Sequence, residues 1–227
     1  IKKVLNFLTL ENLRVPKGIF FGKNHTWTFM EKDGTVSLGL DDFLVNATGI
    51  EVAKSLFPNC PHVAIFDTAF HIDMPEKAHT YAIDSSVCQQ FQIKRYGFHG
   101  INHQYVAEKA SSFLLKPLKD CQFISLHLGN GASACLIKDG KSQDTSMGFT
   151  PLPGLIMGTR CGDIDPSIIL YLNEQGLSIQ EITELLNRES GLKGIGGDND
   201  MRRLLERESA GDTHAKLAID MFCYQLQ

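Results

Sequence analysis

The chain has 227 residues, of which 43% are hydrophobic and 21% are charged, so it can form a packed core and is not a disordered or collagen-like chain. Its 22 lysines and arginines against 26 aspartates and glutamates give a formal charge of −4. This balance argues against nucleic acid as a partner, because sequence-independent binding needs a basic face. No apolar run reaches the roughly 18 residues of a membrane span, and the first 30 residues do not resemble a secretory signal.

The six cysteines contain no Cys-x-x-Cys pair and are too sparse for a disulfide scaffold. We therefore expect free or buried thiols in a reducing cytoplasm. The chain starts at Ile1 rather than at a methionine and ends at Gln227 inside a predicted helix, which suggests a fragment of a longer protein.

Residues 13–48 are predicted to be β-rich, with short strands over 18–21, 25–30 and 35–40. The pair Asp33-Gly34 is typical of a hairpin turn between the second and third strands, because glycine accepts a positive φ. A short helix is expected from Asp41 to Leu44.

From about Ile50 strands and helices alternate, which predicts an α/β fold. Strands are expected over 62–66, 122–128 and 132–137, and helices over 103–115, after Ser178, over 201–208 and after Asp212. Helix 103–115 is expected to bury one face, formed by Val106, Ala110, Phe113 and Leu114.

Helix starts are predicted from capping residues. Ser178 with Glu181 three residues later forms a capping box, and Asp212 caps the last helix. Asp198 or Asn199 is expected to cap the helix over 201–208.

Two glycine-rich segments are candidate anion sites. Residues 127–131 (His-Leu-Gly-Asn-Gly) join two strands, and their glycines allow the backbone to approach a phosphate, although a plain hairpin turn explains them as well. Residues 191–197 are expected to form a loop leading into a helix N-terminus, where anions bind, but capping of the preceding helix explains Gly191 by itself.

Three further motifs carry polar side chains. Asp67 ends a predicted parallel-type strand, at the edge where ligands gather, or is simply a turn or cap residue. His99 lies in an aromatic, glycine-containing turn. Arg160 offers the fork that binds phosphate, unless it only orders its loop by pairing with Asp163 or Asp165.

Taken in chain order, these motifs resemble the acetate kinase family over residues of about 50–227, the central part of that family's chain. The stretches that carry the resemblance are Phe66-Asp67-Thr68-Ala69-Phe70-His71, Arg95-Tyr96-Gly97-Phe98-His99-Gly100, residues 127–131, residues 144–152, residues 158–166 and Asn199-Asp200-Met201-Arg202. The resemblance implies an incomplete α/β lobe of the acetate and sugar kinase, Hsp70 and actin (ribonuclease H-like) superfamily. It also implies reversible transfer of the γ-phosphoryl group of ATP to acetate with Mg²⁺, in a homodimer.

The resemblance also assigns roles by position. Asp67 matches an active-site aspartate described as a proton donor or acceptor, and His99 and Arg160 match residues that stabilise the transition state. The nucleotide-binding positions are His127, Leu128, Gly129, Asn130, Gly131, Asp200, Met201 and Arg202. Because acetate is already ionised at pH 7, no base is needed, and we favour Asp67 as an organiser of Mg²⁺ or its waters. No metal ligand set is assigned.

The sequence departs from the family's pattern in places. Ile101 and Asn102 stand where the family usually has small hydroxyl residues. The family's first phosphate loop, early substrate arginine, late nucleotide loop and metal-linked glutamate are not recognised. We therefore expect this chain by itself not to reach an ordinary kinase rate.

Residues 15–49 resemble the opening strands of glycine cleavage H-protein and lipoyl-type domains, so we predict a β-rich segment over 1–49 and a kinase-like domain over 50–227. Two alternatives to an acetate kinase stay open: a propionate or other short-chain acyl kinase, and an inactive fragment carrying a carrier-domain remnant.

Overall fold

The computed structural model describes residues 26–30, 36–40, 51–52, 54–59, 61 and 66–227. The chain divides into two compact units, residues 1–65 and residues 66–227. The boundary expected near Ile50 falls outside the described residues and stays a prediction, as do the strand over 62–66, the short helix at 41–44 and the turn at Asp33-Gly34. No helix in the described ranges has the length and apolar character needed to cross a bilayer.

In the first unit, strand β1 (Thr26–Met30) pairs antiparallel with β2 (Val36–Leu40). The register places Thr26 opposite Leu40 and Met30 opposite Val36. The structure therefore confirms the second and third predicted strands of this segment and shows that they pair with each other.

The second unit opens with short helices, which are η1 (Ala69–His71), α3 (Glu76–His79) and α4 (Ser85–Phe91). Asp84 begins α4 by accepting hydrogen bonds from the backbone N–H groups of Ser86 and Val87, as an N-cap aspartate does. Gln92 ends the helix in the left-handed conformation.

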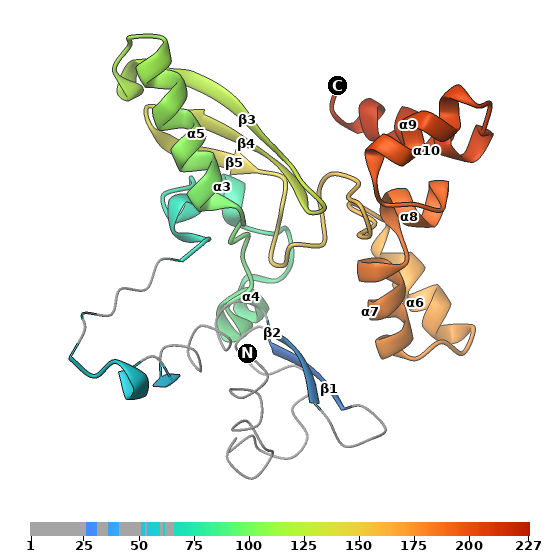
Figure 1. Ribbon diagram of the computed structural model, residues 1–227. Coiled ribbons are helices and arrows are strands. Elements are labelled where there is room, and N and C mark those ends of the chain that lie inside the picture. The colour runs from blue at the N-terminus through green and yellow to red at the C-terminus, as the bar shows by residue number, and fades with distance from the viewer. Residues whose placement is uncertain (1–25, 31–35, 41–50, 53, 60, 62–65) are drawn as a thin grey trace. The chain divides into compact units, whose positions relative to one another are not determined.

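A three-stranded antiparallel sheet follows helix α5 (Gly100–Phe113) and the short η2 (Leu118–Asp120). Its order is β3 (Gln122–Leu128), β4 (Ala132–Lys138) and β5 (Lys141–Thr145), with a bulge between Leu136 and Ile137. Helix α5 lies along one face of the sheet (Figure 1), where Ala107, Cys135 and Ile137 form a buried cluster. The predicted strands over 122–128 and 132–137 are thus confirmed.

The expected buried face of α5 was wrong. The helix runs over 100–113 instead of 103–115, and it buries His103, Ala107 and Ser111, which are spaced four residues apart. Small and polar side chains face the sheet because α5 packs close to it and its histidine bonds to strand serines. The larger Phe113 is instead 86% exposed.

The second unit ends in five helices, whose bounds are α6 (Pro166–Glu174), α7 (Ile179–Arg188), α8 (Gly191–Gly196), α9 (Met201–Ser209) and α10 (Thr213–Gln225). The capping box of Ser178 and Glu181 at the start of α7 is confirmed. Asp212 caps α10 as predicted, accepting from the N–H groups of His214 and Ala215.

Two expectations about this region were wrong. Residues 191–196 form helix α8, not a loop, because the N–H groups of Leu192 and Lys193 bond to the carbonyl oxygens of Met157 and Gly158 and Leu192 is buried. Helix α9 is capped by Asp200, not by Asp198 or Asn199.

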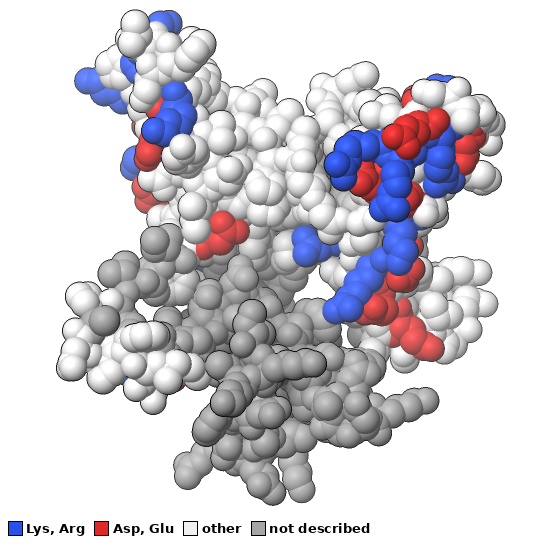
Figure 2. Space-filling view, viewed as in Figure 1, with Lys and Arg blue, Asp and Glu red and all other residues white. Residues whose placement is uncertain are grey.

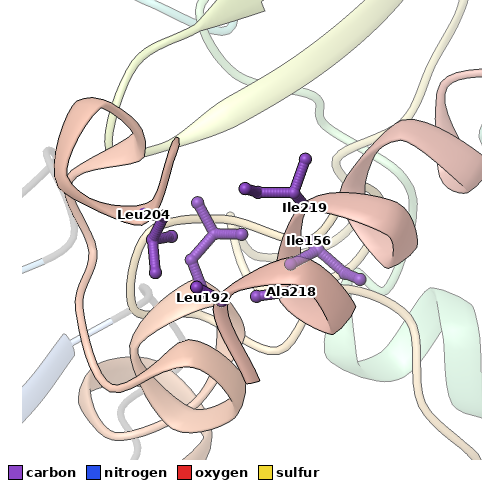
Figure 3. Packing of buried hydrophobic residues seen from close by; sticks show 6 residues of the cluster. Ile156, Leu192, Leu204, Ala218 and Ile219 are labelled. Carbon is purple, nitrogen blue, oxygen red and sulfur yellow. The ribbon is translucent and has the colours of Figure 1, made fainter. Parts of the chain in front are cut away.

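A core of Ile156, Leu192, Leu204, Ala218 and Ile219 joins α8, α9 and α10 to the loop that precedes Gly158 (Figure 3). Outside this core, acidic and basic side chains alternate over α9 and α10 on the face drawn in Figure 2. Several form ion pairs, among them Arg207 with Asp212 and Lys216 with Asp220.

Candidate active site

Asp67 fixes the start of α5. Its Oδ2 accepts a hydrogen bond of 2.6 Å from the backbone N–H of His99, and its carbonyl oxygen accepts one of 2.9 Å from Gly100. His99 is the N-cap of α5 and has a left-handed φ of 59°. Asp67 therefore has the structural role of a turn residue, the alternative to a ligand-binding role, because it holds the backbone at the start of α5. Its Oδ1 has no hydrogen-bond partner among the residues that the structure describes.

The side chains of His99 and Arg160 meet beside Gly131. A methyl group added at Gly131 would lie 3.3 Å from Arg160 Nη1 and 3.4 Å from His99 Nε2. The turn between β3 and β4 therefore approaches both side chains, and only glycine leaves this space open. The structure thus brings together the three residues that the sequence singled out as catalytic, Asp67, His99 and Arg160.

Arg160 does not pair with the acids of its own loop, so that alternative was wrong. Asp163 accepts from the N–H of Gly154, and Asp165 caps α6 by accepting from Ser167. Within the described ranges, no carboxylate forms an ion pair with Arg160. Burial lowers the pKa of its guanidinium, which nevertheless stays charged near neutral pH. A half-buried cation without a counter-ion favours an anionic ligand.

The backbone of Arg160 is held by α8 and its neighbours. The N–H of Met157 donates to the carbonyl oxygen of Arg160, and the N–H of Ser190 donates to that of Thr159. The loop carrying the arginine is therefore fixed to the start of α8 by main-chain hydrogen bonds.

Residues 127–131 form the turn between β3 and β4, as the plain hairpin alternative predicted, and their role as a phosphate loop stays a prediction. The N–H of Gly129 donates to the carbonyl oxygen of Gly131, which closes the turn. The N–H groups of Asn130 and Gly131 donate to no group in the described part of the chain. They remain available to an anion.

Asn130 links the turn to two other predicted segments. Its carbonyl oxygen accepts from the N–H of Gly158, and its Oδ1 accepts from Asn199 Nδ2 at 3.1 Å. The stretch over 199–202 therefore lies beside the turn. Within it, Arg202 binds the two carboxylate oxygens of Asp200 at 3.0 and 2.6 Å, and this pairing helps to lower the pKa of Asp200 to about 2.

His99, His103 and His127 lie close to one another at the candidate site. The rings of His99 and His127 stack with centroids 3.8 Å apart, and His127 Nδ1 lies 3.0 Å from Asn102 Oδ1. Burial and then the nearby His127 lower the pKa of His99 to about 4, against the opposite influence of Asp67. Burial likewise lowers the pKa of His103 to about 3. His99 and His103 are therefore neutral at pH 7.

Sequence reasoning missed the residues that support these histidines. They are His71, Asn102, His103, Ser125, Ser133 and Ser142. Two sequence spacings could have indicated them. His99 and His103 are four residues apart, as on one face of a helix, and Ser125 and His127 are two residues apart, as on one face of a strand. Among the described residues, no group of three or more histidine, cysteine, aspartate or glutamate side chains forms a metal cluster.

Comparison with known proteins identifies the family. The family model described as the Acetokinase family matches residues 43–227. The chain belongs to the acetokinase family. The match starts before the boundary expected near residue 50, so it takes in residues 43–49, which the sequence analysis placed in the N-terminal segment. The resemblance of residues 15–49 to lipoyl-type domains stays a prediction.

Individual acetokinase relatives agree with this assignment. Acetate kinase of Carboxydothermus hydrogenoformans is 53% identical over 182 residues, which are 80% of this chain and 46% of that protein. The crystal structure of Porphyromonas gingivalis acetate kinase matches with a TM-score of 0.76 and 40% identity over 79% of this chain and 46% of that chain.

A propionate kinase from Francisella tularensis matches with a TM-score of 0.75 and 48% identity, over the same shares of the two chains. The predicted α/β kinase lobe is thus confirmed as the fold class. The chain spans about half the length of the curated relatives that it matches.

Proposed function

We propose that the chain forms the phosphoryl-transfer part of an acetate kinase, which moves the γ-phosphoryl group of ATP reversibly to acetate and yields acetyl phosphate and ADP. The observation that carries the proposal is the meeting of Arg160 and His99 beside Gly131, with no carboxylate paired to the arginine in the described part of the chain. Membership of the acetokinase family supports the choice of reaction.

The chemistry fits this arrangement. Phosphoryl transfer spreads negative charge over three equatorial oxygens, so it needs fixed donors more than a base. Arg160 provides a permanent positive charge, and His99 provides an N–H from a neutral ring. Main-chain hydrogen bonds hold the loop of Arg160, and the backbone N–H of His99 donates to Asp67 Oδ2.

The nucleotide phosphates would lie over the turn at 127–131, where the N–H groups of Asn130 and Gly131 point to no protein acceptor in the described ranges. Arg202, which is 86% exposed and held by Asp200, would contact the nucleotide from the next segment. This grouping supports the assignment of His127, Leu128, Gly129, Asn130, Gly131, Asp200, Met201 and Arg202 as nucleotide-binding residues.

Asp67 is the residue that fits Mg²⁺. This ion typically takes one or two carboxylates and completes its shell with water and substrate phosphates, so a single oxygen such as Asp67 Oδ1 suits it. When bound, the ion neutralises charge on the phosphates. Asp67 itself would hold the ion or its waters while its Oδ2 keeps His99 in place.

The proposal extends to the setting of the intact enzyme, a homodimer in the cytoplasm. The five cysteines in the described ranges are free thiols, which is typical of a reducing compartment.

The test is a graft of residues 43–227 into the matching stretch of the Carboxydothermus enzyme, followed by an assay of ADP and acetyl phosphate formation. We expect turnover in the ordinary range of about 1–10³ s⁻¹. In that graft, Arg160→Ala should lower kcat by roughly 10³-fold with a much smaller change in the KM for ATP, because the arginine acts on the transition state.

The matched control is Lys119→Ala, which removes an exposed positive charge in η2 and should leave kcat unchanged. A graft that binds ATP but transfers no phosphoryl group would refute the proposal. An unchanged kcat in Arg160→Ala would mean that this residue is not catalytic.

Propionate is the second candidate acceptor, because the Francisella propionate kinase is similar to this chain at 48% identity. The same graft assayed with acetate and propionate at equal concentrations compares the two by their kcat/KM values.

A further inference from the structure

A chain of hydrogen bonds runs from His99 into the protein. His99 Nδ1 lies 2.8 Å from Ser133 Oγ, the same oxygen lies 2.8 Å from His103 Nε2, and His103 Nδ1 lies 3.0 Å from Ser125 Oγ. The three supporting residues come from β4, α5 and β3. Ser133 and His103 are completely buried, and Ser125 is 5% exposed.

This chain has two directions in which Ser133 donates to one histidine and accepts from the other. If both histidines donated to Ser133, the hydroxyl hydrogen of this buried serine would have no acceptor in the described part of the chain. A neutral imidazole has one N–H donor and one acceptor nitrogen, and a serine hydroxyl donates a single hydrogen. If Ser125 donates to His103, then His103 donates to Ser133 and Ser133 donates to His99 Nδ1, so that His99 carries its hydrogen on Nε2. If the direction reverses, His99 Nε2 is a bare acceptor.

The Ser125 end decides between the directions. In the reversed direction, Ser125 accepts from His103, and its own hydroxyl hydrogen then needs another acceptor. Its Oγ forms no other hydrogen bond with the part of the chain that the structure describes. A buried polar group left unpaired is disfavoured by roughly 5-fold to 160-fold. The direction that ends in a donor at His99 Nε2 is therefore preferred.

We propose that Ser125, His103 and Ser133 are positioning residues that set the tautomer of His99, so that its Nε2–H is presented beside Arg160 to a phosphoryl oxygen. The inference rests on the proposed function for the identity of that oxygen. The opposite tautomer would place a nitrogen lone pair against an anion, and the site would lose one of its two side-chain donors.

A second buried pair provides a matched control. His71 Nε2 donates to the carbonyl oxygen of Phe98, so its Nδ1 must accept from Ser142, whose Oγ lies 2.8 Å away. Ser142 is as buried as Ser133, and it bonds to His71 and Cys135 but not to His99. Ser142→Ala thus removes a buried serine–histidine bond without touching the proposed chain.

The test reads tautomers directly by NMR of the full chain labelled with ¹⁵N-histidine at pH 7, with the signals of His99 assigned through His99→Gln. We expect His99 to carry its hydrogen on Nε2 in excess by roughly 5-fold or more. Ser125→Ala should reduce that excess by a similar factor, although Ser125 does not touch His99. Ser125→Thr, which keeps the hydroxyl in a strand, should restore it. Ser142→Ala should shift the signals of His71 alone.

A predominant Nδ1–H tautomer of His99 in the unmodified chain would overturn the inference without any variant being needed. An unchanged His99 tautomer in folded Ser125→Ala would overturn it as well. The readout is independent of kinase activity. An inactive graft together with the Nε2–H tautomer would refute the proposed function while supporting this inference, and an active graft with the Nδ1–H tautomer would do the reverse.

Discussion

Replacing Gly191 by alanine tests how the Arg160 loop is held. Gly191 has φ +61°, in the left-handed region that side chains rarely adopt. A methyl group there would lie 2.5 Å from the carbonyl oxygen of Arg160 and closer still to that of Met157. Both contacts are with backbone atoms, so neither can be relieved by turning a side chain. Gly191→Ala must therefore shift the loop, move α8, or both.

The expected loss of stability follows from these two features. Alanine in a left-handed conformation costs about 1–2 kcal/mol, and forcing extra atoms into a packed region costs about 1–3 kcal/mol. We expect Gly191→Ala to lower the free energy of unfolding by about 2–5 kcal/mol in total. The matched control is Gly176→Ala, because Gly176 also has a positive φ, +101°, but nothing lies within 4 Å of an added methyl group.

The measurement is urea unfolding followed by far-UV circular dichroism. Fluorescence is unsuitable because the single tryptophan, Trp27, belongs to the first unit. The difference between the two variants isolates the close approach, and it should be about 1–3 kcal/mol. If both variants lose the same free energy within about 0.5 kcal/mol, the contact between Gly191 and the Arg160 loop is not a packing constraint, and our account of how the loop is held is wrong.

Two further outcomes are expected. The free energy of unfolding should be steady above pH 6.5 and fall as the pH drops toward about 4, because His99 and His103 have pKa values of about 4 and about 3 in the folded chain and take up protons on unfolding. Each histidine lowers the free energy of unfolding by at most about 1.4 kcal/mol per pH unit. A urea midpoint that does not change between pH 6.5 and 4 would contradict this expectation. Leu204→Ala in the core of Figure 3 should cost about 2–5 kcal/mol. Leu170→Ala, at a position 65% exposed, should change stability by less than about 0.5 kcal/mol, and equal losses would place Leu204 outside the core.

The sequence predicted the local elements of the second unit where a short-range signal specifies them. The capping box of Ser178 and Glu181 involves residues three apart, so it is readable without tertiary information. The choice among Asp198, Asn199 and Asp200 as the cap of α9 is different, since all three types cap helices well. The structure uses Asp198 to accept from the N–H of Asp200, which leaves Asp200 to cap the helix.

The glycine-rich stretch over 191–197 shows where tertiary contacts override propensity. Glycine disfavours a helix by about 1 kcal/mol per residue, so a loop was the natural expectation. Helix α8 forms because its first N–H groups find carbonyl oxygens in the Met157–Arg160 loop and because Leu192 enters the core. Neither partner is visible from the sequence of the segment itself.

Some residues of the candidate site could be predicted from the sequence, and others could not. Asp67, His99 and Arg160 were found because their motifs match a known family, and the structure brings them together. The supporting residues Ser125, Ser133 and His103 were missed, because a histidine on a helix and serines on strands look like surface residues until the helix is placed on the sheet. Phe113 misled for the converse reason, since an apolar residue near a helix end does not have to be buried.

The charges of the site fit together in one further respect. Of Arg160, His99 and His103, Arg160 keeps its positive charge at every accessible pH, while burial holds His99 and His103 neutral at pH 7. A protonated His99 beside Arg160 would raise the repulsion between two half-buried cations, and Arg160 is indeed among the causes that lower the pKa of His99. The site thus places its positive charge on the group that cannot lose it and takes its second donor from a neutral ring. A neutral ring can point either a hydrogen or a lone pair at a ligand. The hydrogen bonds of Ser133, His103 and Ser125 are therefore needed to decide which of the two His99 presents.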